Sequence, residues 1–200
     1  MKRIFNFLSI VALLFAVSHS AASMQSREVL SDKNRSRSRD AATGDRGADR
    51  VAANDDSASL TSDQRRLREI GTLEQQCLDE VNRLRRMHGL SRLMFDDSLL
   101  EVARGYSRRM SDEHFFSHVD PDGLSVRERI ERANIKWKAL GENLAYANGY
   151  VNPVAASLHG WMESPGHRSN ILDPDFQVSA VGVWIGTNGT VYFTEIFLKP

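Results

Sequence analysis

Near residue 178 the apolar side chains of this 200-residue chain change their spacing. Before that point, residues 73–88 carry apolar side chains three and four positions apart, which predicts an amphipathic helix that Gly89 ends. After it, residues 178–185 and 190–198 are rich in β-branched and aromatic side chains and flank an Asn-Gly turn, which favours a tight hairpin. Helices first and a hairpin last predict an α+β domain, in which helices pack on an antiparallel sheet.

Capping and turn residues place the remaining elements. A second helix is expected to begin near residue 96, where Ser98 and Glu101 fit a capping box. The other expected elements are helices over residues 125–133 and 154–163 and a short strand over residues 144–147. No internal repeat is visible, so these elements are expected to belong to one domain.

The N-terminus has the three parts of a secretory signal peptide. Two basic residues precede an apolar run over residues 4–17, and small residues follow it. The run is shorter than the roughly 20 apolar residues that a membrane-spanning helix needs. We therefore expect a signal peptide over residues 1–23, cleaved near Ala22 or Ser23. The mature protein would then be secreted or periplasmic, without a stable membrane anchor.

A charged segment follows the signal peptide. Residues 24–60 contain seven basic and seven acidic residues, and few apolar side chains other than alanine. Such a segment cannot bury enough apolar surface to offset the conformational entropy lost on ordering. We therefore expect a disordered, charged linker over residues 24–66 and one folded domain over residues 67–200. Because positive and negative charges cancel in the segment and in the whole chain, no nucleic-acid partner is expected.

The chain has a single cysteine, Cys77, and therefore no internal disulfide. Cys77 lies on the apolar stripe of the first predicted helix, at helical spacing. A buried core thiol is the expected role, because free cysteine behaves as a small apolar side chain.

Three polar residues are each expected at the end of an element or in a loop. His118 follows the second helix, Glu142 follows a glycine, and His167 follows a Ser-Pro-Gly sequence where the fourth helix is expected to end. Two imidazoles and one carboxylate are the protein ligands of an open catalytic zinc site. Glu163 would supply a second carboxylate, as a general base beside a bound water. The candidate metal ligands are thus His118 and His167, and the candidate catalytic residues are Glu142 and Glu163.

Each of these residues also has a purely structural interpretation. His118 would cap the second helix, Glu142 would accept backbone amides in a tight turn, and His167 would lock the Pro-Gly bend. Glu195 poses a separate question, because it shares a strand face with apolar side chains, where a carboxylate is unfavourable unless it is paired. It is either an edge residue that faces water or a fourth polar member of the same site.

Six short motifs follow one another in a specific order. They are Asn82-Arg83, Phe116-Ser-His118, Gly141-Glu-Asn-Leu-Ala145, Trp161-Met-Glu-Ser-Pro-Gly-His-Arg-Ser-Asn-Ile-Leu172, Val181-Gly-Val183 and Tyr192-Phe-Thr-Glu-Ile-Phe197. As a set they resemble the CAP superfamily, also called the SCP domain, which groups cysteine-rich secretory proteins, antigen 5 and pathogenesis-related proteins. The last helix-to-loop motif is similar to that of the short bacterial-type branch.

This resemblance implies an α-β-α sandwich, in which an antiparallel sheet lies between helical layers. It also implies a cleft with two histidines and two glutamates, which in some members holds zinc or another divalent metal ion. His118, Glu142 and His167 match that set directly. The second glutamate is expected at Ser164, whereas this chain has its carboxylate one residue earlier, at Glu163. The disulfides of the eukaryotic branch are absent, because the chain has one cysteine.

The resemblance favours a non-enzymatic role, because enzymatic activity is not a general property of such domains and no activated nucleophile accompanies the motifs. We therefore expect a monomeric, secreted binding module for an envelope, lipid or peptide ligand, with a His/Glu cleft as the candidate site for a divalent metal ion such as zinc. The first alternative is a metal-dependent, protease-like hydrolase that uses the same cleft. The second is a structural envelope protein whose histidines stabilise loops.

Overall fold

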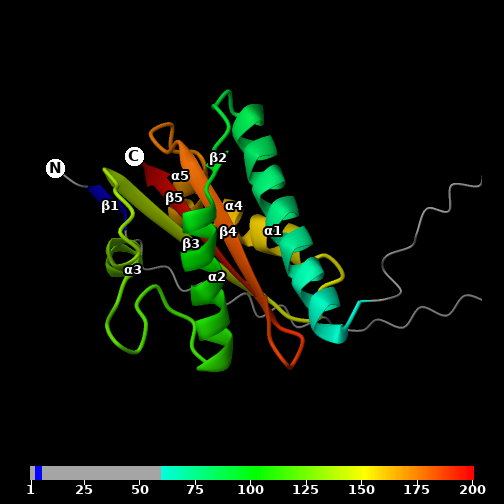
Figure 1. The fold of residues 1–200 in the computed structure, drawn as a ribbon. Helices are drawn as coiled ribbons and strands as arrows, with labels where there is room; N and C mark the ends of the chain where they lie inside the picture. The colour runs from blue at the N-terminus through cyan, green and yellow to red at the C-terminus, as the bar shows by residue number, and fades with distance from the viewer. Residues whose placement is uncertain (1–2, 6–59) are drawn as a thin grey trace, which may run out of the picture. The chain divides into compact units, whose positions relative to one another are not determined.

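The fold is given by a computed structural model that describes residues 3–5 and 60–200 (Figure 1). Its elements in chain order are β1 (Arg3–Phe5), α1 (Ser62–Met87), β2 (Met94–Phe95), α2 (Asp97–Asp112), α3 (Val126–Arg132), β3 (Ala139–Ala147), α4 (Pro153–Glu163), α5 (Pro165–Ile171), β4 (Val178–Ile185) and β5 (Val191–Lys199). Most of the expected signal peptide and linker, including the cleavage site, lies outside these residues. Within the described part of the chain, no helix has both the length and the hydropathy needed to cross a bilayer.

Three long strands form the centre of the sheet, whose strand order is β1-β3-β5-β4-β2. β5 pairs in antiparallel fashion with both β3 and β4, and β4 and β5 form the expected hairpin. Gly189 of the hairpin turn has a φ of 78°, a conformation that glycine adopts without strain. The short strands β1 and β2 add parallel pairs at the two edges. The predicted α+β class and the antiparallel centre of the sheet are confirmed.

One face of the sheet is covered by α1, α4 and α5, whose apolar side chains pack against the odd-numbered residues of β4 and β5. The helices contribute Ile70, Cys77, Leu78, Val81, Val154, Leu158, Trp161 and Ile171, and the two strands contribute Val181, Val183, Val191, Phe193 and Phe197. Full burial of each large apolar side chain contributes about 1.5–3 kcal/mol relative to exposure. More buried residues lie in this layer than on the opposite face of the sheet, so this layer is the larger part of the core.

The opposite face is covered by α2 and α3, so the sheet lies between two helical layers as predicted (Figure 1). Helix α2 comes so close to β4 that a Cβ atom added to Gly182 would lie 2.0 Å from the backbone nitrogen of Arg104. Ser107 Oγ of α2 donates a hydrogen bond to Gly182 O at 2.8 Å. The glycine of the Val-Gly-Val motif is therefore required by the contact between helix and sheet.

Helix α1 begins earlier than the sequence pattern suggests. Thr61 and Gln64 form a capping box, in which Gln64 N donates to Thr61 Oγ1 at 3.2 Å and Thr61 N donates to Gln64 Oε1 at 2.8 Å. These bonds satisfy backbone donors that have no partner within the helix. The helix consequently starts at Ser62, inside the segment assigned to the linker, and the folded domain begins before residue 67.

Two other local predictions are corrected by the structure. Asp96 rather than Ser98 caps α2, because the Asp96 side chain accepts a hydrogen bond from Leu99 N at 2.9 Å. The chain also does not form a loop after α4, because α5 begins at once with Pro165, and His167 lies within this helix. Proline suits the first helical position, where its missing N–H would have had no partner.

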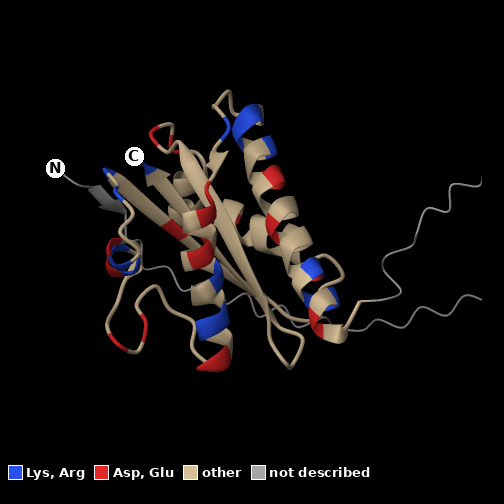
Figure 2. Ribbon diagram, in the orientation of Figure 1, with Lys and Arg blue, Asp and Glu red and all other residues tan. Residues whose placement is uncertain are grey.

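Charged residues lie mainly along the helices and loops, with both signs interspersed, whereas the strands are mostly uncharged (Figure 2). Glu74 of α1 is buried, and it pairs with Arg104 of α2 through two bonds of 2.8 and 2.6 Å. Glu74 Oε1 also accepts a hydrogen bond from Val183 N at 3.0 Å. This network joins α1 and α2 at β4. Cys77 is free and buried in the α1 layer, as predicted.

Candidate functional site

His118 and Glu142 meet directly, although they are 24 residues apart. His118 lies in the loop after α2, and Glu142 lies within β3 rather than in a turn before it. Glu142 is the register partner of Ile196, which places it on the face covered by α2 and α3. His118 Nδ1 is 2.7 Å from Glu142 Oε1, and the side chains are 22% and 2% exposed, respectively. The carboxylate is therefore inside, with the imidazole between it and solvent.

Arg129 of α3 is the second partner of Glu142. Its Nη2 forms an ion pair with Glu142 Oε2, and its Nη1 donates to Leu124 O at 3.1 Å. The guanidinium carbon lies 3.3 Å from the ring centroid of Tyr106, whose hydroxyl donates to Ser117 O at 2.6 Å. Burial raises the pKa of Tyr106 to about 12, so the phenol stays neutral. Both carboxylate oxygens of Glu142 are thus engaged, and its charge is balanced by a guanidinium.

His167 approaches His118 from α5, a helix of the opposite layer. The two ring centroids are 6.2 Å apart, with an angle of 37° between the ring planes. His167 is buried, and this burial, together with the nearby His118, lowers its pKa to about 4. The His167 ring is therefore neutral at pH 7, with one nitrogen as a donor and the other as an acceptor.

Two asparagines and a tryptophan hold α4 and α5 against β3. Asn143 Nδ2 donates to His167 O at 3.1 Å. Asn170 Nδ2 donates to Glu142 O at 3.2 Å and to Asn143 Oδ1 at 2.9 Å. Trp161 Nε1 donates to a β3 carbonyl at 2.9 Å. These buried bonds position His167 against the strand that carries Glu142.

The residues present do not fit the metal site that the resemblance implies. Glu142 is already paired with Arg129, and His118 turns its Nδ1 toward the same carboxylate. The two imidazoles therefore have no free carboxylate beside them. Within the described part of the chain, no group of three or more His, Cys, Asp or Glu side chains is placed to hold a metal ion.

The second expected carboxylate does not join this group. Glu163 is exposed at the last residue of α4, and among residues 60–200 its side chain has no hydrogen bond or ion pair. Ser164, at the position where the resemblance implies a glutamate, is buried, and its Oγ has no hydrogen-bond partner among the described residues. The structure thus brings together His118, Glu142 and His167 and leaves Glu163 at the surface.

Glu195 lies in neither of the two places expected for it. It is fully buried on the sheet face covered by α1, so it neither faces water nor joins Glu142 on the other face. Ser179 Oγ donates to Glu195 Oε1 at 3.2 Å, whereas Oε2 has no partner among the described residues. Burial raises the pKa of Glu195 to about 8, although the Ser179 hydrogen bond and the charge of Arg85 act to lower it. Glu195 is therefore a protonated core residue at pH 7.

Aromatic side chains extend the site along β3. Tyr146 shares a strand face with Glu142, and Tyr192 of β5 is its register partner. The Tyr146 ring centroid lies 5.0 Å from that of Phe116 and 6.2 Å from that of Tyr192. We call Phe116, Tyr146 and Tyr192 the aromatic ladder. Tyr146 is 41% exposed, and Phe116 precedes His118 by two residues, so the ladder is continuous with the histidine loop.

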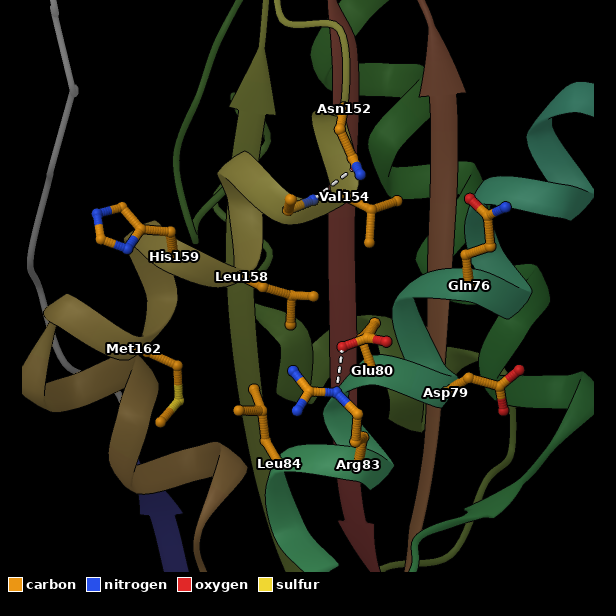
Figure 3. Close-up of a pocket in the computed structure, with 11 residues that line it drawn as sticks. Gln76, Asp79, Glu80, Arg83, Leu84, Asn152, Val154, Leu158, His159 and Met162 are labelled. Carbon is orange, nitrogen blue, oxygen red and sulfur yellow. Dashed lines mark hydrogen bonds and ion pairs between the residues drawn. The ribbon is translucent and has the colours of Figure 1, made fainter. Parts of the chain in front are cut away.

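A separate groove of about 720 Å³ lies between α1 and α4 (Figure 3). Leu84, Leu158 and Met162 extend into the space between the two helices, and the ion pair between Arg83 and Glu80 lies beside them. The groove shares no lining residue with the histidine site. The sequence patterns did not predict it, because it depends on how two distant helices pack.

Sequence reasoning also missed Arg129. Nothing in the spacing of α3 distinguishes this arginine from Arg127 and Arg132 in the same helix. Asn143 and Asn170 lie within two of the six family motifs, which marks them as candidate functional residues. The sequence did not indicate that they would pair with each other between β3 and α5.

Residues 78–197 match the family model described as the cysteine-rich secretory protein family, CAP. The chain is 38% identical over 128 residues to the uncharacterized membrane protein YlbC of Bacillus subtilis and 31% identical over 130 residues to the uncharacterized protein YkwD of the same organism. These alignments cover 64% and 65% of this chain but only 35% and 49% of the relatives, so the chain spans less than half the length of either.

A similar fold has been solved in another bacterium. The crystal structure of an extracellular protein containing a SCP domain from Bacillus anthracis matches with a TM-score of 0.63 and 31% sequence identity, over 70% of this chain and 44% of that chain. The family model spans more than half of the present chain, and its range includes β3, β4, α5 and both histidines of the site. The chain therefore belongs to the CAP family of cysteine-rich secretory proteins, as a member of the bacterial type.

Proposed function

We propose that this CAP domain is an exported, non-enzymatic binding module that recognises an envelope, lipid or peptide ligand beside His118 and the aromatic ladder. The observation that carries the proposal is that the aromatic ladder continues into the loop of His118. There His118 contacts the buried carboxylate of Glu142, whose charge is balanced by Arg129. Ligand sites commonly combine aromatic surface with a few polar groups that set orientation. His118 would supply the orienting hydrogen bond, and the ladder would supply apolar contact area.

The local chemistry supports binding over covalent catalysis. Glu142 is not a free base, because both of its oxygens are paired. The single cysteine is buried in the opposite layer, where burial raises the pKa of its thiol and keeps it unreactive. Export is supported by the expected signal peptide and by the Bacillus anthracis relative, which is described as extracellular.

Binding by the full chain can be measured against three probes: purified peptidoglycan sacculi, vesicles of phosphatidylglycerol and phosphatidylethanolamine, and an immobilised peptide library. We expect Tyr146→Ala and His118→Ala each to weaken binding to one of these probes by roughly tenfold or more, about 1.4 kcal/mol. Met162→Gln, in the groove between α1 and α4, is the matched control and should bind like the unchanged protein. Binding to none of the probes, or a loss confined to Met162→Gln, would contradict the proposal.

A hydrolase is the second candidate, favoured by one observation. A histidine whose Nδ1 contacts a buried carboxylate is oriented to act as a general base through Nε2. In that reaction His118, rather than Glu142 or Glu163, would accept the proton from an attacking water. Turnover of a p-nitrophenyl ester or of casein would then fall roughly 100-fold in His118→Ala and stay unchanged in Glu163→Gln. Equal turnover in all three proteins would remove this candidate.

A further inference from the structure

Arg129 is the cation that contacts Glu142, through an ion pair between its Nη2 and Glu142 Oε2. The Arg129 side chain is only 9% exposed, and it pairs with a carboxylate that is 2% exposed. Its guanidinium also donates to two loop carbonyls and lies over the ring of Tyr106. Cation–π contact and charge-assisted hydrogen bonds both favour a guanidinium at this place.

This arrangement engages both carboxylate oxygens of Glu142. His118 Nδ1 takes the second carboxylate oxygen at 2.7 Å, so only His118 Nε2 remains for a ligand. A divalent cation placed on Glu142 would face the fixed positive charge of Arg129 in a poorly solvated site, where like charges repel strongly. It would also have to displace either the guanidinium or the imidazole from the carboxylate.

We infer that Arg129 is a built-in cation that takes the place of a divalent metal ion beside Glu142, which makes this site independent of metal. The inference concerns the chain's own residues and does not depend on which ligand the domain binds. Its direct consequence is that the positive charge of Arg129 keeps metal ions from binding beside Glu142. Removing that charge should raise the affinity of the same residues for a metal ion, because Glu142 Oε2 would then have no cationic partner.

The test is calorimetric titration of the chelator-treated full chain with zinc chloride. Arg129→Met keeps most of the apolar stem and removes the charge, and Arg129→Glu adds a carboxylate. We expect each variant to bind zinc at least tenfold more tightly than the unchanged chain, with the larger gain for Arg129→Glu. Addition of His118→Ala to either variant should abolish the gain. Arg127→Met is the matched control, because Arg127 lies on the same short helix with a side chain that is 44% exposed, and it should change nothing.

Two results would overturn the inference. The first is that Arg129→Met and Arg129→Glu both fold, as judged by thermal unfolding, yet gain no zinc affinity that depends on His118. The second needs no arginine variant and therefore holds even if those proteins do not fold. If His118→Ala alone weakens zinc binding to the otherwise unchanged chain by tenfold or more, the site binds metal with Arg129 in place.

Discussion

Replacing Glu195 with glutamine should make the protein more stable at alkaline pH and leave its stability at pH 4 nearly unchanged. The Glu195 carboxyl is fully buried, accepts one hydrogen bond from Ser179 and has an oxygen, Oε2, with no partner among the described residues. Its ordinary pKa is 4.5, and burial raises the native pKa to about 8. Between these two values the native protein holds a proton that the unfolded chain has released.

The direction of the pH dependence follows from this difference. The favourable contribution of the protonated carboxyl is fully present below pH 4.5 and is lost as the pH rises through about 8. At about 1.4 kcal/mol per pH unit, this window corresponds to about 5 kcal/mol of unfolding free energy. Typical domains have a total stability of roughly 5–15 kcal/mol, so the effect should be large. Glutamine has almost the same shape and does not titrate, so Glu195→Gln should lack this loss.

The assay is urea unfolding of both proteins from pH 4 to pH 9, followed by tryptophan fluorescence. The difference in unfolding free energy should rise from near zero at pH 4 to about 5 kcal/mol at pH 9. Other titrating groups are common to both proteins and cancel in the comparison. Glu163→Gln is the control, because Glu163 is exposed, and its curve should follow that of the unchanged protein. A difference between the Glu195 variant and the parent that stays constant across the pH range would refute the reasoning.

Three further predictions concern packing, capping and burial. Gly182→Ala in β4 should lower the unfolding free energy by about 1–3 kcal/mol, because the added methyl group meets the backbone of Arg104 in α2. Gly105→Ala, on the exposed side of α2, should instead raise the unfolding free energy by about 0.5–1 kcal/mol. If the urea midpoints of the two variants shift in the same direction, the close approach of α2 to β4 would be contradicted. Thr61→Ala should cost about 1 kcal/mol, seen as a lower melting temperature, because it removes the cap of α1; an unchanged melting temperature would mean that the first turn adds nothing to the fold. The Cys77 thiol should react with Ellman's reagent only after unfolding, because it is fully buried; rapid reaction in the native protein would argue against that burial.

Local patterns predicted the elements whose apolar spacing is clear. The hairpin of β4 and β5 and the helix α4 were predicted to within one or two residues, because β-branched and aromatic side chains flank an Asn-Gly turn in the hairpin, and turn residues bound the helix. β3 was recognised only at its end, because residues 139–144 are buried on both faces and show no alternation. α5 was missed, because Ser-Pro-Gly reads as a stop signal although proline also begins helices.

The sequence by itself determined the α+β class, the buried role of Cys77 and the grouping of His118, Glu142 and His167, because periodicity and motif order are local properties of the chain. Only the tertiary structure decided which charges meet. Arg129 reaches Glu142 from another element, 13 residues away, because α3 packs on the same sheet face. Glu195 lies on the other face, because strand register sets the side on which each residue of β5 points. One carboxylate is consequently paired with a guanidinium and the other is protonated in the core, although the sequence alone does not distinguish them.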